Sequence, residues 1–124
     1  MLALLLLTTA VTVGPQDTLS PAAQRVLTDV RFLAADSQEG RGVGTAGLER
    51  AGAYIRDGFA GAGLRVSFQN FTIPPDAPAV LHTTLGGTPT RNAVAVISGS
   101  SRALRGQVVV VGAHYDHLGL GGCS

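Results

Sequence analysis

Four consecutive valines at positions 108–111, followed at once by the residues GAHYDH, constrain this chain more than any other feature. An uninterrupted run of β-branched residues is typical of a strand, and its lack of alternation predicts that both faces of the strand are covered. We therefore expect residues 107–113 to form the central strand of a sheet. Gly112 and Ala113 leave room at the strand end, where ligands bind in open α/β sheets.

Three further stretches have strand character. Alternating apolar residues over 66–73 predict a strand that two prolines end, and residues 79–87 (AVLHTTLGG) are a weaker candidate. Residues 92–97 (NAVAVI) precede the valine run, from which a short Gly-, Ser- and Arg-rich connection separates them. A parallel crossover needs about a dozen or more residues and usually a helix. We therefore expect residues 92–97 and 107–113 to be antiparallel neighbours.

Two helices are expected before the first strand. Ser20 is suited to cap the first helix and Pro21 to begin it, and apolar residues recur at helical spacing as far as Ala34. The second helix is expected between Thr45, as its cap, and Gly63, which can end it. One face of each helix should be core. The predicted fold class is α/β, a three-layer α/β/α domain with a mixed sheet.

The composition is that of one globular domain. The chain has 124 residues, of which 45% are hydrophobic and 14% charged, which is enough for a single modest core. The net charge is only +1 and the arginines are scattered singly, so we expect no nucleic-acid partner. The single cysteine, Cys123, cannot form an internal disulfide.

The N-terminal residues 2–13 form an uncharged apolar run. The run is too short to span a bilayer but suits the apolar region of a signal peptide. We therefore expect residues 1–14 to be a signal peptide, residues 15–124 to be the mature domain, and the protein to be exported to the periplasm or the extracellular space without a stable membrane span. The alternative is a buried N-terminal helix or strand.

Residues 42–47 (GVGTAG) match the G-x-G-x-x-G pattern of dinucleotide-binding turns, whose glycines let the backbone approach a pyrophosphate at a helix N-terminus. That pattern requires a buried strand immediately before the first glycine. Here the preceding residues, 34–41 (AADSQEGR), are mostly polar. The sequence therefore favours a loop of tight turns, and a nucleotide-binding domain is the less favoured hypothesis.

The segment HYDH is the candidate site. In an extended segment His114 and Asp116 point to the same face, so the carboxylate can accept a hydrogen bond from one imidazole nitrogen while the other nitrogen binds a metal ion. Tyr115 points to the opposite face and is expected to pack. His117 is an alternative second ligand, and with His114 and Cys123 it could hold one zinc ion, although no general base would accompany it. A simple hydrogen-bonded His–Asp pair is the alternative to any metal site.

Blocks of this sequence resemble the di-zinc exopeptidases, the family that includes bacterial leucyl aminopeptidases, aminopeptidase Y and glutamate carboxypeptidase-like proteins. Residues 29–64 look like the N-terminal helix, loop and second helix of that family, and the loop at 39–47 (EGRGVGTAG) accounts for the nucleotide-like pattern. Residues 91–119 look like its strand pair and first zinc-ligand motif. The resemblance covers most of the chain after residue 14.

The resemblance implies that His114 binds one zinc ion and that Asp116 orients His114 without binding metal. It also implies a zinc aminopeptidase acting on peptide substrates, in which two zinc ions polarise the scissile carbonyl and activate a bridging water while a glutamate is the general base. The other parts of that family's site are a bridging Asp, a Glu-Glu pair, a further acidic ligand and a last His. They should follow the first motif, and no residue up to Ser124 can be assigned to them.

We therefore expect residues 15–124 to be the N-terminal part of a zinc peptidase domain, truncated after the first metal-ligand strand and inactive alone. Two hypotheses from other classes remain. The first is a non-catalytic remnant or interaction module with the same half-fold, and the second is the nucleotide-binding domain. The resemblance leaves open whether the chemistry is that of an aminopeptidase, a carboxypeptidase or a glutaminyl cyclase.

Overall fold

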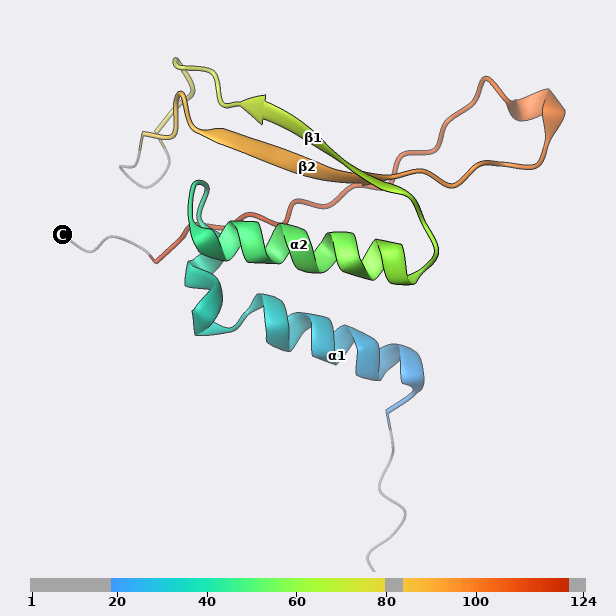
Figure 1. Ribbon diagram of the computed structural model, residues 1–124, viewed down its shortest axis with the longest axis horizontal. Helices are drawn as coiled ribbons and strands as arrows, with labels where there is room; N and C mark the ends of the chain where they lie inside the picture. Colours follow the sequence, from blue (N-terminus) through green and yellow to red (C-terminus); the bar gives the residue numbers. More distant parts are fainter. Residues whose placement is uncertain (1–18, 80–83, 121–124) are drawn as a thin grey trace, which may run out of the picture.

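The computed structural model describes residues 19–79 and 84–120. Two strands form an antiparallel sheet, helix α2 lies against one face of it, and helix α1 lies beyond α2 (Figure 1). Mixed helices and strands agree with the α/β class at this coarse level. The elements are α1 (Pro21–Leu33), the 3-10 helix η1 (Asp36–Arg41), α2 (Ala46–Gly61), β1 (Val66–Thr72), β2 (Pro89–Ala95) and the 3-10 helix η2 (Arg102–Leu104).

Both helices begin where the sequence predicts. The Ser20 side chain accepts a hydrogen bond from the Ala23 N–H at 3.2 Å, and the Thr45 hydroxyl accepts one from the Leu48 N–H, also at 3.2 Å. Each cap satisfies a backbone donor that the first turn of a helix leaves without a partner. After α2, Gly63 has a left-handed φ of 78°, as is common where a helix ends.

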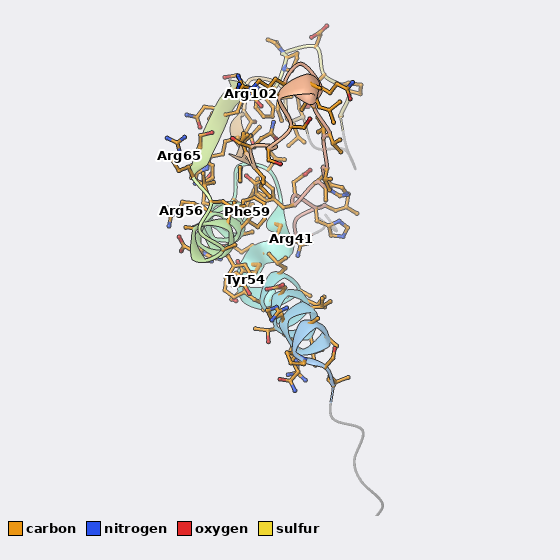
Figure 2. The ribbon with its side chains drawn as sticks, turned by 90° about the vertical axis from the view of Figure 1, so that its right-hand side faces the viewer. Arg41, Tyr54, Arg56, Phe59, Arg65 and Arg102 are labelled. Carbon is orange, nitrogen blue, oxygen red and sulfur yellow. The ribbon has the colours of Figure 1, made fainter. Side chains whose placement is uncertain are left out.

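The core of the described residues is small and belongs to α2. Leu48 and Ala51 are its buried apolar side chains, 4% and 0% exposed. For α1 the prediction of a core face is wrong within the described residues, because Val30 is 55% exposed and no residue of this helix is buried. Helix α1 reaches α2 through Phe32, whose ring stacks on that of Tyr54 with 4.0 Å between centroids. Tyr54 is labelled in Figure 2.

Strand β1 confirms the strand predicted over residues 66–73. Its partner β2 takes up only the first part of the predicted 92–97 stretch and begins on the N-terminal side of it. The register places Val66 opposite Ala95. In the described part of the chain, helices cover one face of this sheet only (Figure 1).

The valine run departs most from its prediction. Residues 107–113 have no regular secondary structure and pair with no described strand, so the predicted central strand antiparallel to 92–97 is wrong here. The four valines at 108–111 are 82–94% exposed. The reason is the path of the chain: after β2 it runs out through η2, and the segment that follows then comes back between the sheet and α2 (Figure 1). No described strand lies beside the valines to pair with their backbone.

Three predictions fall wholly or partly outside the described residues: the signal peptide at 1–14, the role of Cys123, and the candidate strand at 79–87, of which 80–83 are not described. Over residues 19–79 and 84–120, no helix combines the length and the apolar character that crossing a membrane requires.

Candidate metal-ligand motif

After η2 the chain returns between the sheet and α2 (Figure 1), and His114 and Asp116 belong to this returning segment. Tyr115, between them, anchors this segment on both sides. Its hydroxyl donates to the backbone carbonyl of Arg91 in β2 at 2.6 Å, and its ring lies against Gly52 of α2. Tyr115 therefore packs, as predicted, and alternation along the segment leaves its two neighbours on the other face.

The structure brings the imidazole of His114 onto Asp116. Nδ1 of His114 lies 3.0 Å from the backbone oxygen of Asp116 and 3.5 Å from a carboxylate oxygen. Both atoms are acceptors, so a neutral imidazole here carries its proton on Nδ1 and presents an unprotonated Nε2. Because the His114 side chain is 80% exposed, Nε2 is accessible to a metal ion.

Further metal ligands do not converge on His114. His117 is exposed, and its backbone N–H donates to the Arg41 carbonyl at 2.8 Å. Among the described residues, which do not include Cys123, no three His, Cys, Asp or Glu side chains are grouped closely enough to hold a metal ion. A catalytic zinc usually has about three protein ligands and a water. The described residues therefore bring together one candidate ligand, His114, and the carboxylate of Asp116 beside it, and do not form a complete zinc site.

The glycine-rich loop ahead of α2 packs backbone to backbone against the motif. The Gly119 N–H donates to the Gly40 carbonyl at 3.1 Å, and Gly42 forms a parallel bridge with His117. A Cβ on Gly40 would overlap the Gly119 carbonyl, and one on Gly42 would lie 2.8 Å from the Gly119 Cα. Only glycine permits so close an approach of two backbones. The glycines of this loop therefore serve the packing around His114.

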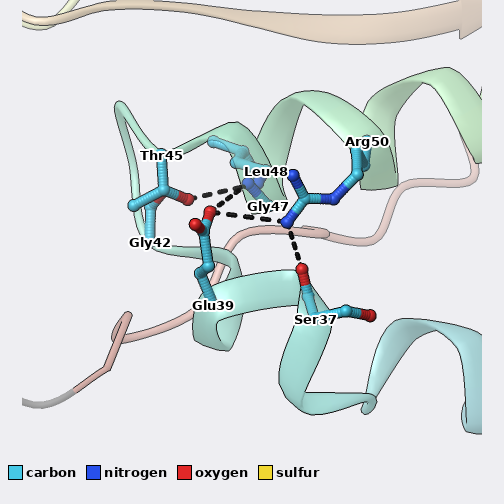
Figure 3. A network of polar contacts seen from close by, with 7 residues as sticks. All are labelled: Ser37, Glu39, Gly42, Thr45, Gly47, Leu48 and Arg50. Atoms are coloured by element: carbon cyan, nitrogen blue, oxygen red, sulfur yellow. Dashed lines mark hydrogen bonds and ion pairs between the residues drawn. The ribbon is translucent and has the colours of Figure 1, made fainter.

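The N-terminus of α2, where the dinucleotide pattern would place a pyrophosphate, is occupied by a side chain (Figure 3). The Glu39 carboxylate accepts a hydrogen bond from the Gly47 N–H at 2.6 Å. Arg50 lies 3.5 Å from the same carboxylate and also donates to the Ser37 carbonyl. The element before the first glycine is η1 and not a strand. A protein carboxylate takes the position of a phosphate, which argues against the nucleotide-binding hypothesis.

Two charged residues of the loop were missed by sequence reasoning. Glu39 and Arg41 have left-handed φ angles of 51° and 49°, which are uncommon for residues with a side chain. Glu39 caps α2, and the Arg41 Nε donates to the Tyr115 carbonyl at 2.9 Å. The sequence offered one signal for these two residues: they flank Gly40, so two charged side chains stand beside a glycine in a tightly turning loop.

A hollow of about 180 Å³ opens beside the motif. Its lining combines apolar side chains with polar groups of β2 and of the motif itself. Its lining includes Val43, Leu48, Phe71, Ile73, Arg91, His114, Tyr115 and Asp116.

Tyr115 lines this hollow as a neutral phenol. Burial raises the pKa of its phenol; the Arg91 charge opposes the rise, whereas Glu49 and Asp116 add to it. The hydroxyl therefore stays protonated and donates to the Arg91 carbonyl at 2.6 Å. This contact supports a packing role for Tyr115 and not one in proton transfer.

The chain matches no protein-family model, no curated protein and no solved structure. The likeness to the zinc exopeptidases therefore rests on its sequence motifs.

Proposed function

We propose that this chain is the N-terminal part of an exported zinc-dependent aminopeptidase with a three-layer α/β/α catalytic domain, and that it supplies the first ligand motif of the active site. In this motif His114 Nε2 binds zinc and Asp116 orients the imidazole. The observation that carries the proposal is the contact of His114 Nδ1 with two oxygens of Asp116, which directs the free lone pair to Nε2. Proteins commonly orient metal-binding histidines in this way.

The exposed valine run supports the wider proposal. The valines at 108–111 are 82–94% exposed, whereas a run of this kind is typical of a strand that is buried on both faces. We assign the covering strands and helices, the remaining zinc ligands and the general base to polypeptide that follows the residues described. Bound zinc would supply a Lewis acid and an activated water for hydrolysis of the N-terminal peptide bond of a peptide substrate.

The test starts from the source DNA. The reading frame is followed beyond the Ser124 codon for an Asp, a Glu-Glu pair and a late His, and the complete protein is expressed for zinc analysis and for assays on aminoacyl-4-nitroanilides. We expect His114→Ala to lose zinc and activity together. Asp116→Asn should keep most of the zinc and lower kcat/KM roughly 10- to 100-fold, as changes to groups that orient a metal ligand do.

His117→Ala is the matched control, because it removes the same side chain three positions along the segment. It should keep zinc content and rate. The proposal is wrong if His114→Ala retains the zinc and rate of the wild-type protein, or if the complete protein releases no N-terminal residue. Loss of zinc in His117→Ala would instead make His117 a second ligand.

A further inference from the structure

We propose that Arg41 is the positioning residue that fixes the HYDH segment and thereby aims the His114 imidazole. Its importance for catalysis rests on the proposed function, but the positioning itself does not. Arg41 is the last residue of η1, the short helix that follows α1 (Figure 2).

Arg41 holds the segment on both sides of Asp116. Its side-chain Nε donates to the Tyr115 carbonyl at 2.9 Å, and its own carbonyl accepts from the His117 N–H at 2.8 Å. A hydrogen bond from a charged donor contributes more than a neutral one. The orientation of the Asp116 oxygens that hold His114 Nδ1 therefore depends on these two flanking bonds.

The guanidinium of Arg41 also ties the segment to the first helix. Its Nη1 donates to the Leu33 carbonyl, at the C-terminal end of α1. One planar group thus joins two carbonyls from elements that lie far apart in the sequence. A lysine could donate to either carbonyl but lacks the fork that reaches both.

The backbone of the loop is strained where it makes these contacts. Glu39, Gly40 and Arg41 have φ angles of 51°, 56° and 49°. Non-glycine residues in this region cost on the order of 1 kcal/mol or more each and persist where surrounding contacts hold them. The hydrogen bond from the Gly47 N–H holds Glu39 in this conformation. With the loop backbone held in this way, the Arg41 carbonyl faces the His117 N–H.

The experiment compares Arg41→Gln and Arg41→Lys with the wild-type chain of 124 residues. Arg56→Gln is the matched control, because this arginine pairs with Asp57 on α2, away from the motif (Figure 2). Amide hydrogen exchange is read at His117 and Gly119, whose carbonyl partners on the loop are unchanged by the substitutions. The tautomer of the neutral His114 imidazole is read by its ¹⁵N shifts.

We expect Arg41→Gln to raise exchange at His117 and Gly119 about tenfold or more, as loss of a charged hydrogen bond does, and to move His114 from the Nδ1–H form towards a mixture of tautomers. Exchange in α2 and in β1 and β2 should not change. Arg41→Lys should restore part of both effects, and Arg56→Gln should show neither.

The proposal is overturned if Arg41→Gln leaves the exchange and the His114 tautomer unchanged, or if exchange rises equally in α2 and the sheet, which would make Arg41 a general stabiliser of the fold. These results are separate from the zinc test. A local effect of Arg41→Gln together with normal zinc in His114→Ala would sustain the positioning role and reject the aminopeptidase.

Discussion

The loop–helix unit at 36–61 and the valine segment at 96–111 are both rich in small or apolar residues, and they differ in what lies beside them. In the first, Leu48 is 4% exposed, while in the second Val111 is 94% exposed. Hydrophobicity does not explain why one region is buried and the other exposed, because the exposed region contains the four-valine run and is the more apolar of the two. The difference is that the glycines and caps of the first unit bring it into contact with other backbone groups, within the unit and on the segment around Gly119.

Contacts between backbone segments, together with one side-chain carboxylate, hold the loop ahead of α2 in place. Gly40 and Gly42 admit the segment around Gly119, and the Glu39 carboxylate satisfies the N-terminus of α2. The valine segment has no such partner within the described residues. Of these two regions, the one that contacts other segments of the described chain contains the buried residues, and the comparison can be tested at single positions.

The largest effect is expected from Gly47→Ala. Gly47 lies at the start of α2, and a Cβ there would overlap the carbonyl of Gln38 in η1. Because η1 must then separate from α2, we expect the free energy of unfolding to fall by about 3 kcal/mol or more. Urea unfolding followed by circular dichroism measures it. Gly58→Ala is the control, because a Cβ there meets nothing within 4 Å, and it should stabilise the helix by up to about 1 kcal/mol. Equal effects at the two glycines would contradict the packing of η1 on α2.

Leu48→Ala and Val109→Ala compare the two regions directly. Leu48 is 4% exposed and Val109 is 91% exposed. Truncation of the buried leucine should lower the free energy of unfolding by about 2–3 kcal/mol, and truncation of the exposed valine should change it by no more than about 0.5 kcal/mol. The same urea titration serves for both. A comparable loss at Val109 would show that the valine run is buried in solution.

Tyr115→Phe tests the anchor of the motif. Loss of the hydrogen bond to the Arg91 carbonyl should lower the free energy of unfolding by about 1 kcal/mol at neutral pH. Burial raises the pKa of Tyr115 above its ordinary value of 10.0, so folding favours the protonated phenol. That stabilisation is complete below pH 10 and is lost as the pH rises through the folded-state pKa.

A pH series of urea titrations measures this loss, which should be shallower in Tyr115→Phe. Some alkaline dependence should remain, because hydrogen bonding to Asp29 raises the pKa of Tyr54 as well. Identical alkaline profiles in the two proteins would show that Tyr115 is solvated and does not anchor the segment.

The smallest effect on stability is expected from Val109→Lys, which should instead change how strongly the chain associates with itself. The valine run is exposed and pairs with no strand that the structure describes. A charge in its middle should change the free energy of unfolding by no more than about 0.5 kcal/mol and reduce self-association, because lysine opposes pairing between strand edges. Light scattering against protein concentration measures it, with Val109→Ile as the apolar control. If Val109→Lys associates as strongly as Val109→Ile, the valine run is not the surface through which copies of the chain associate.

Much of the local structure could be predicted from the sequence. Ser20 and Thr45 are caps because their side chains reach a backbone N–H three residues on, and β1 follows from alternation. The contact of His114 with Asp116 follows from the two-residue period of an extended segment. Each of these depends on residues within a few positions of one another.

The sequence by itself determined the helix starts, the first strand and the pairing of His114 with Asp116, since backbone geometry alone controls distances over three or four residues. Only the tertiary structure decided that Arg41 holds Tyr115, 74 positions away, that the Glu39 carboxylate accepts from the Gly47 N–H at the start of α2, and that the valine run pairs with no strand among residues 19–79 and 84–120. Contacts across such separations depend on the path of the chain and on which partners are present. Periodicity and composition carry no record of either.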